Sequence, residues 1–348
     1  MSDRKVIVGI SHGDVNGIGY ELFIKTFQDN RLYDLCTLVV YGSPKVAAYH
    51  RKALNVNNFS FNSLSSAEVL NNKKANLVNC IDDNIRVEFG KPTAMSSEAA
   101  VISLEHAVKD LEDGKIDVLV TAPMSYDETL LENINFSGHS NYLKNKFNTS
   151  NTLTLWINRL MKIAVVSDKI AIKEVSEHIT EDNILSKLSI LNKSLVEDFA
   201  IRGPKIAVLS LNPSSNDNFG KEEVEVIIPT IEKANKEGVI ALGPFSADKF
   251  FGSDDFTKFD AILAMYHDQG IAPFNALNSD SNIKYTAGLP IIRTAPDHGP
   301  RHDISGTGKA STDSFREAIY MACDMFENRK LHKELTKNPL KKHKNLNR

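Results

Sequence analysis

The sequence predicts an α/β protein with mostly parallel sheets. Short, continuous apolar runs recur along the chain, and segments whose apolar residues follow a helical period lie between them. Continuous apolar runs are typical of strands that are buried on both faces of a parallel sheet. The strand and helix patterns alternate through almost the whole chain, which favours an α/β fold over separate helical and strand regions.

The part of the chain before residue 125 is predicted to begin with a strand, a glycine loop and a helix. The loop, SHGDVNGIGYE, matches neither the G-x-G-x-x-G dinucleotide motif nor the P-loop. The polar region 57–84 is expected to form irregular or edge structure. The predicted elements are strand Val6–Ile10, helix Leu22–Phe27, strand Thr37–Val40, helix Met95–Leu111 and strand Ile116–Val120.

The remainder of the chain continues the alternation. Its apolar runs predict further buried strands, and a final helix is expected to begin near Ser311–Ser314. The predicted strands are Thr152–Ile157, Ile163–Val166, Ile206–Leu211, Val239–Leu242, Ala261–Met265 and Leu289–Ile292, and the predicted helical segments are Ile170–Asn192 and Glu222–Lys236.

Composition and charge are those of an ordinary globular protein. The chain has 348 residues, of which 42% are hydrophobic and 24% charged, and its net charge is -3. A nucleic-acid partner is therefore not expected. At roughly 150 residues per domain, this length predicts two domains. The basic segment Lys330–Arg348 is interpreted as a solvated chain end and not as a binding arm.

The cysteines and the apolar runs predict a cytoplasmic location. Cys36, Cys80 and Cys323 are far apart and form no C-x-x-C pair, which argues against a disulfide framework and a cysteine zinc site. The first apolar run, Val6–Ile10, is short and lacks a signal-peptide cleavage pattern. No apolar run approaches the roughly 20 residues that a membrane-spanning helix needs, so no membrane partner is expected.

Charged and ring-bearing residues follow two of the predicted strands. Ligands of open α/β sheets bind outside the carboxyl ends of the strands, so we expect a site there. Gly306 and Gly308 precede the last predicted helix, whose first amide groups favour an anion. The residues at the strand ends are His267 and Asp268 after Ala261–Met265, and Arg293, Asp297 and His298 after Leu289–Ile292.

Several motifs occur in order between residues 6 and 325. They are SHGD at 11–14, NGIGYE at 16–21, TAP at 121–123, GHS at 138–140, LNP at 211–213, MYHDQG at 265–270, GLP at 288–290, IRT at 292–294, DHG at 297–299 and GTGKA at 306–310. Together they give the chain a resemblance to the 4-hydroxythreonine-4-phosphate dehydrogenase family.

The resemblance implies a homodimer of chains with two α/β/α domains, similar to the isocitrate and isopropylmalate dehydrogenases. We expect a terminal domain of residues 1–131 and 290–348 and a central domain of residues 132–289. The active site is expected in the cleft between them, with residues borrowed from the partner subunit. Family members use NAD and a divalent metal (Zn, Mg or Co) to oxidise 4-phosphooxy-L-threonine, and the product loses carbon dioxide on the route to pyridoxal phosphate.

The resemblance also implies roles for individual residues. A metal held by imidazoles activates an alcohol oxygen, and arginine binds phosphate with a fixed orientation. No catalytic acid or base is assigned. The expected substrate contacts are His139, Ser140, Asn275, Lys284 and Arg293, the expected cofactor contacts are Asp297, Gly306 and Gly308, and the expected metal ligand is His267.

Two of the metal-binding positions carry other residue types in this chain. Lys169 and Ser214 stand where the resemblance implies histidines. A protonated lysine repels a divalent cation and a serine hydroxyl is a weak ligand. Two substrate positions have exchanged types, because Asn275 replaces a lysine and Lys284 replaces an asparagine. If both residues face one pocket, the pocket keeps one positive charge, but at a different position. The alternative is that the two positions changed independently of each other.

Three functions stay open on the sequence alone. The first is the NAD-dependent dehydrogenase, and the second is a catalytically silent paralogue that binds a phosphorylated metabolite or a partner. The third is a phosphate acyltransferase with a related cleft. For the metal site, the carboxylates of Asp168 and Asp217 are candidate replacements for the imidazoles. Alternatively, Lys169 is a candidate base or a positively charged substitute for the metal.

Overall fold

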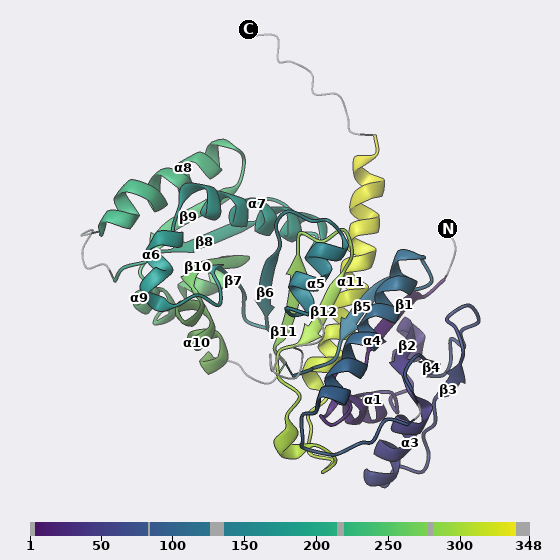
Figure 1. Ribbon diagram of the computed structural model, residues 1–348. Helices are drawn as coiled ribbons and strands as arrows, with labels where there is room; N and C mark the ends of the chain where they lie inside the picture. The colour runs from purple at the N-terminus through teal and green to yellow at the C-terminus, as the bar shows by residue number, and fades with distance from the viewer. Residues whose placement is uncertain (1–3, 83, 126–135, 214–218, 278–280, 339–348) are drawn as a thin grey trace.

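The computed structural model describes residues 4–82, 84–125, 136–213, 219–277 and 281–338. In this part of the chain one sheet of twelve strands runs through the whole molecule, in the order β3-β4-β2-β1-β5-β12-β11-β6-β7-β10-β8-β9 (Figure 1). The strands are β1 (Val6–Ser11), β2 (Cys36–Gly42), β3 (Asn62–Leu64), β4 (Asn76–Asn79), β5 (Val118–Thr121), β6 (Leu153–Ile157), β7 (Lys162–Ser167), β8 (Lys205–Leu209), β9 (Ile240–Phe245), β10 (Ala261–Tyr266), β11 (Ile283–Ala287) and β12 (Arg293–Pro296).

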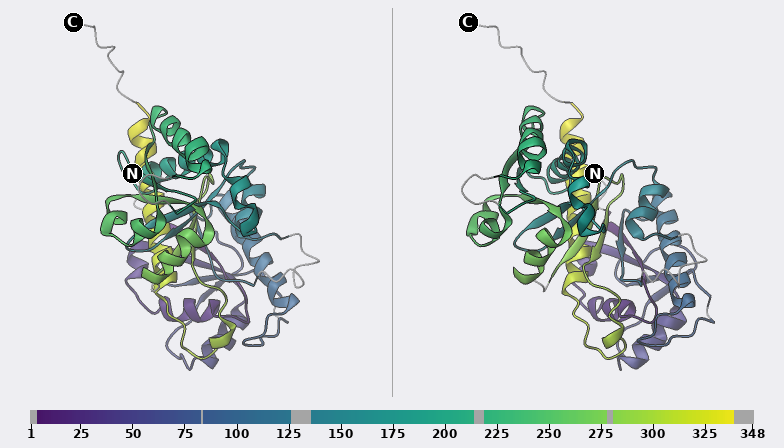
Figure 2. Two further views of the ribbon diagram at one scale, coloured as in Figure 1. Left: turned by 90° about the vertical axis from the view of Figure 1, so that its left-hand side faces the viewer. Right: turned by 60° about the vertical axis from the view of Figure 1, so that its left-hand side comes forward.

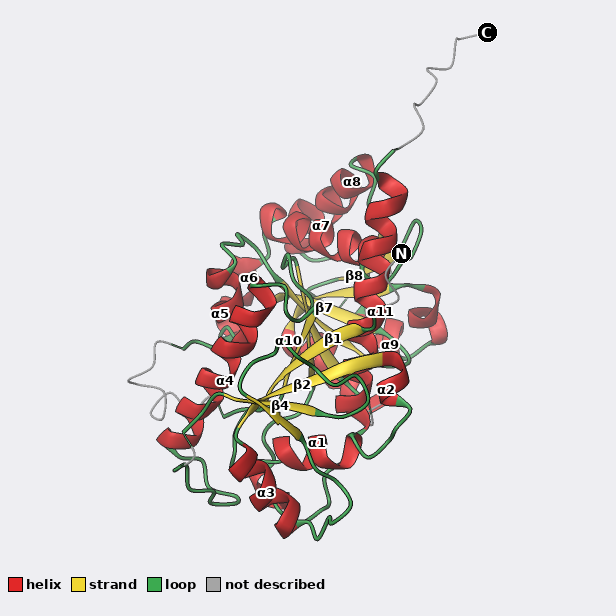
Figure 3. Cartoon of the chain, turned by 90° about the vertical axis from the view of Figure 1, so that its right-hand side faces the viewer, coloured by secondary structure: helices red, strands yellow, loops and turns green. Residues whose placement is uncertain are grey.

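Helices surround this sheet (Figure 3). Short 3-10 turns cover Ile172–Glu174, Asp254–Lys258 and His302–Ile304, and a π-helical stretch covers Glu223–Ile227. The α-helices are α1 (Gly19–Thr26), α2 (Leu32–Leu35), α3 (Pro44–Ala53), α4 (Ala94–Glu112), α5 (His139–Lys146), α6 (Val175–His178), α7 (Glu181–Glu197), α8 (Ile228–Lys236), α9 (Ala247–Phe251), α10 (His267–Leu277) and α11 (Asp313–Thr336). None of the helices in the described part of the chain is long and apolar enough to span a membrane.

Local sequence fixes where several helices begin. Thr93 caps α4, and its hydroxyl accepts a hydrogen bond from the Ser96 amide while the Ser96 hydroxyl satisfies the Thr93 amide. Ser43 caps α3, just before Pro44, and its hydroxyl accepts hydrogen bonds from the amides of Lys45 and Val46. Gly138 precedes α5 with a φ of 101°, a conformation that glycine adopts without strain. The turn at Gly138 leads directly into His139, the first residue of α5.

The sheet consists of two parallel parts, β3 to β12 and β7 to β9, joined by the two strands β11 and β6 through antiparallel pairings. The six strands from β3 to β12 come from residues before 131 or after 290, and the six from β11 to β9 come from residues 132–289. β11 is antiparallel to both β12 and β6, and β6 is antiparallel to β7. This strand order agrees with the two expected domains, whose division stays a prediction.

Alternate residues of the strands pack into different cores. On one face, a single core extends across both parallel parts and includes Val8 of β1 and Leu263 of β10. On the other face there are two separate cores, one under α4 and α5 and one under α9 and α10. The middle strands of the sheet therefore lie between two groups of helices on this second face.

The final helix, α11, joins the two parts of the sheet. It packs on β12, β5, β1 and β11 and also touches α7, and Figure 2 shows it running between the two halves of the molecule. Asp198, at the end of α7, is buried and accepts hydrogen bonds from Arg329 of α11, from Ser194 at 2.6 Å and from the Tyr285 hydroxyl at 2.6 Å. α11 is thus held by an ion pair as well as by apolar contacts.

The α/β class and the alternation of elements are confirmed. The predicted strand Leu289–Ile292 is wrong, because the strand in this region is Arg293–Pro296. β12 and β10 also end at opposite edges of the sheet. Three antiparallel pairings separate β12 from β10, so the two strands run in opposite senses. The amino end of β12, with Arg293, therefore lies at the same edge as the carboxyl end of β10, with His267.

Candidate active site

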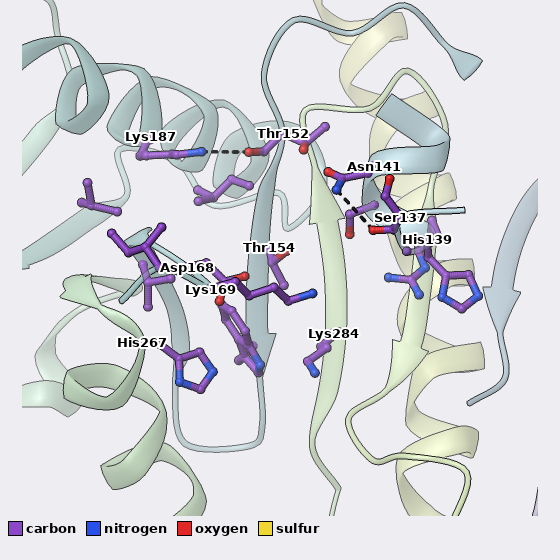
Figure 4. Close-up of a pocket in the computed structure, with 18 of the residues that line it drawn as sticks. Ser137, His139, Asn141, Thr152, Thr154, Asp168, Lys169, Lys187, His267 and Lys284 are labelled. Carbon is purple, nitrogen blue, oxygen red and sulfur yellow. Dashed lines mark hydrogen bonds between the residues drawn. The ribbon is translucent and has the colours of Figure 1, made fainter. Parts of the chain in front are cut away.

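A pocket of about 730 Å³ lies on the second face of the sheet, between the two groups of helices. Its walls come from the loop before α5, from β6 and the end of β7, from α7 and α10, and from β11 and β12 (Figure 4). Among the described residues that line it, four are cationic side chains and two are carboxylates, an excess of two positive charges. The cations are Lys169, Lys187, Lys284 and Arg293, and the carboxylates are Asp168 and Asp268.

Arg293 and His139 form one end of the pocket. The Arg293 side chain is only 5% exposed, and its guanidinium donates hydrogen bonds to the Thr121 hydroxyl at 3.0 Å and the Thr286 hydroxyl at 3.3 Å. His139 is buried, and burial together with the charge of Arg293 lowers the pKa of the imidazole well below its usual value. A neutral His139 and a buried guanidinium therefore face the pocket, and Ser140 lines it next to them.

Lys284 lies on β11 directly opposite Trp156 of β6. Its ammonium group is 2.7 Å from the Asp297 carboxylate and 5.8 Å from the centre of the Trp156 ring. Asn275, by contrast, is not among the described residues that line the pocket, and its side-chain oxygen accepts a hydrogen bond from Asn282 at 3.0 Å. Of the two positions with exchanged residue types, Lys284 is the one that faces the pocket.

His267 is the first residue of α10 and lies on the opposite side of the pocket from His139 (Figure 4). Its side chain is 46% exposed, its Nδ1 is 2.8 Å from the Asp268 carboxylate, and its ring meets the Trp156 ring edge-on at 5.8 Å. The carboxylate orients the ring, so the Nε2 atom is the one available to a ligand.

Asp168 and Lys169 both line the pocket because β7 ends at Ser167. Neighbouring residues within a strand face opposite sides, but this rule stops where the strand stops. Lys169 has a φ of 57°, in the left-handed region. Ser214 and Asp217 lie outside the described residues.

The described residues of this pocket do not fit a divalent metal. Among the described residues, no group of three or more histidine, cysteine, aspartate or glutamate side chains is arranged to hold a metal ion. Lys169 brings a positive charge to the position where a ligand is expected. Such a charge repels a divalent cation, and His267 supplies a single imidazole.

Two of the three predicted cofactor contacts, Gly306 and Gly308, lie around a different loop, whereas the third, Asp297, is paired with Lys284 of the pocket. The amides of Gly308 and Ala310 donate hydrogen bonds to the buried Glu21 carboxylate at 3.3 and 2.8 Å. A side chain at Gly306 would collide with the Phe89 ring, since a Cβ atom there would lie 2.9 Å from it. The anion bound by the amides of Gly308 and Ala310 is therefore the chain's own glutamate, and these two amides do not fit a cofactor phosphate.

Sequence reasoning missed Lys187 and Trp156. Lys187 donates a hydrogen bond to the Thr152 carbonyl at 3.0 Å, and burial is the main cause that lowers the pKa of its ammonium group. The sequence did contain one signal that Lys187 is buried. Lys187 is three residues after Ile184 and one before Leu188, and both of these belong to the buried face of α7. A lysine at such a position must reach a polar pocket or solvent.

Comparison with known proteins shows to which family the chain belongs. The family model described as "Pyridoxal phosphate biosynthetic protein PdxA" matches residues 34–322. The chain belongs to this family. A PdxA relative from Bacteroides thetaiotaomicron, named 4-hydroxythreonine-4-phosphate dehydrogenase, is 45% identical over 345 residues, which cover 98% of this chain and 94% of the relative.

Two further PdxA proteins extend the comparison. A Sulfurihydrogenibium protein of the same name is 33% identical over 319 residues, or 91% of this chain and 97% of the relative. The crystal structure of the 4-hydroxythreonine-4-phosphate dehydrogenase from Klebsiella pneumoniae matches with a TM-score of 0.79 and 26% identity, over 92% of this chain and 99% of that one. The expected family and the expected enzyme class, an oxidoreductase, are confirmed.

Proposed function

We propose that this PdxA protein oxidises the secondary alcohol of 4-phosphooxy-L-threonine, or of a similar phosphorylated hydroxy acid, on the route to pyridoxal phosphate. The observation that carries the proposal is the excess of positive charge in the pocket. The substrate has a phosphate, a carboxylate and an ammonium group. Four cations match its two anionic groups, and the carboxylates of Asp168 and Asp268 are suited to the ammonium group.

The end of the pocket near Arg293 is the best place for the phosphate. A guanidinium binds phosphate oxygens in two parallel hydrogen bonds. Ser140 is in the first turn of α5, where hydroxyl and backbone N–H groups favour an anion. Because burial keeps His139 neutral, its ring can donate one hydrogen bond to the phosphate without adding a charge.

We further propose NAD as the acceptor of the hydride and loss of carbon dioxide from the keto acid that forms. Support for NAD comes from the dehydrogenase names of the relatives, since oxidation of an alcohol needs an acceptor for two electrons and side chains supply none. In this keto acid the new carbonyl group is two carbons from the carboxylate carbon, so carbon dioxide is lost when the C–C bond breaks and its electron pair passes to the carbonyl oxygen as an enolate. Nearby cations stabilise the negative charge that develops there, and Lys169 and Lys284 are the cations available among the described residues.

We also propose that the protein is a cytoplasmic homodimer and that each active site contains residues of both subunits. The cytoplasmic location is supported by Cys36, Cys80 and Cys323, which are all free thiols. The shared active site is an expectation from the family. Light scattering of the purified chain tests the assembly, and a mass of one chain would contradict it.

The experiment for the activity follows NADH absorbance with 4-phosphooxy-L-threonine as substrate, beside released carbon dioxide. We expect turnover that depends on both NAD and substrate. A silent paralogue is the second candidate, and the presence of Lys169 in the pocket favours it. Substrate binding without NADH formation would contradict the dehydrogenase and support the paralogue.

A further inference from the structure

Lys169 has an unusual backbone for a residue with a long side chain. Its φ of 57° lies in the left-handed region, which is unfavourable for residues that carry a Cβ atom. Strained backbone of this kind clusters at functional sites. Figure 4 draws the Lys169 side chain inside the pocket, between Asp168 and Lys284. The left-handed backbone at Lys169 thus accompanies a cationic side chain that lines the pocket.

The charges around Lys169 suit an anionic ligand and not a metal. Lys284, which is paired with Asp297, and Lys187 also line the pocket, and Asp168 is the adjacent carboxylate. A divalent cation in this position would be repelled by three ammonium groups. An anionic substrate would be attracted by the same three groups.

We propose that the ammonium group of Lys169 binds the hydroxyl and carboxylate oxygens of the substrate, and that the pocket binds its substrate without a divalent metal. The proposal rests on the substrate class put forward above. Arg293 at one end then takes the phosphate, while Lys169 takes the hydroxy-acid end. An ammonium group is a compact donor of three hydrogen bonds, so it can contact both oxygens at once.

Trp156 makes this proposal directly testable. It is the only tryptophan of the chain, its side chain is 4% exposed, and it lines the pocket between Lys284 and His267. Its fluorescence therefore reports on binding in the pocket without a label. The experiment titrates the full-length, EDTA-treated protein with 4-phosphooxy-L-threonine, before and after addition of Mg²⁺ or Zn²⁺, with no NAD present.

We expect the same dissociation constant with and without metal. Lys169→Met should weaken binding by about tenfold or more, since it removes the charge and keeps the length of the side chain. Lys169→Arg should keep most of the affinity. Lys173→Met is the matched control, because Lys173 is an exposed lysine four residues away whose partner is Glu174.

The variant Lys169→Gly distinguishes a role of the Lys169 side chain in substrate binding from a role in stability. Glycine relieves the left-handed strain, so the melting temperature should rise while substrate affinity falls. A metal requirement for binding, or unchanged affinity in Lys169→Met, would overturn the proposal, and so would no binding by the wild-type protein under either condition. Metal-free binding without NAD-dependent turnover would contradict the proposed dehydrogenase activity and support the role of Lys169.

Discussion

His12 and His50 flank the Tyr20 ring inside the amino-terminal half of the molecule. Their ring centres are 5.6 and 5.1 Å from that of Tyr20, and both side chains are fully buried. Burial lowers the pKa of each histidine to about 4. Both rings are therefore neutral in the folded protein at neutral pH, in contact with an apolar core that cannot accept a charge.

The low pKa values predict a loss of stability in acid. The unfolded chain takes up protons near the usual histidine pKa of about 6.5, whereas the folded chain takes them up only near pH 4. Stability is thus constant above pH 6.5 and falls as the pH decreases below it. One such ring costs about 2 kcal/mol at about pH 5.

Urea unfolding at about pH 7.5 and about pH 5 tests this prediction. His12→Phe should reduce the difference in unfolding free energy between the two pH values by about 2 kcal/mol, because phenylalanine cannot be protonated. The control is His106→Gln, since His106 is exposed on α4. An unchanged pH difference in His12→Phe would contradict the argument.

Single residues also show how far the sequence predicts the site. His139, Arg293 and His267 were found because they sit in motifs, and all three line the pocket. Lys187 was missed because a charged residue in a helix is usually solvent-exposed, and its burial depends on where α7 packs. Whether these residues bind what we expect stays a prediction.

At the scale of elements, α11 depends on the ion pair between Arg329 and Asp198. Arg329 also donates to the carbonyl groups of Pro290 and Leu289, so it connects three segments. Arg329→Met should lower the free energy of unfolding by about 3 kcal/mol, because it leaves the carboxylate of Asp198 buried without its cation. Chemical unfolding measures the change, and Lys333→Met, at an exposed position on the same helix, is the control.

The double variant Asp198→Asn with Arg329→Met checks the cause of this loss. Asparagine removes the buried charge, so the double variant should be more stable than Arg329→Met alone. An equal or lower stability would show that packing of Arg329, and not its charge, holds the helix.

Helices and strands could be predicted from the sequence where the spacing of apolar residues alone determines the type of element. The strand Arg293–Pro296 was misplaced by four residues because it starts with Arg293 and Thr294, polar residues that are buried through hydrogen bonds to Thr121 and the Ala318 carbonyl. α10 was not predicted either. It contains a glycine and Pro273, which usually interrupt helices, and the buried side chains of Ile271 and Phe274 stabilise it against the sheet.

At the scale of the whole molecule, the continuous sheet predicts cooperative unfolding. The ladder between β12 and β11 and the contacts of α11 join the two parts that the sequence assigns to separate domains. Calorimetry should therefore give one transition, and the loss of Trp156 fluorescence should coincide with the loss of helical circular dichroism. Two separated transitions would show that the parts unfold independently.

The pairing of β6 with β11 has a consequence for how the chain can be rearranged. Leu153, the first residue of β6, pairs with Ala287, the last residue of β11. In an antiparallel pair, partners of this kind have Cα atoms about 5 Å apart. The segment 153–287 therefore leaves and rejoins the rest of the chain at one point, like an insertion in a host protein. Adjacent ends are the condition for circular permutation, and this segment is the natural one to excise, permute or exchange between relatives.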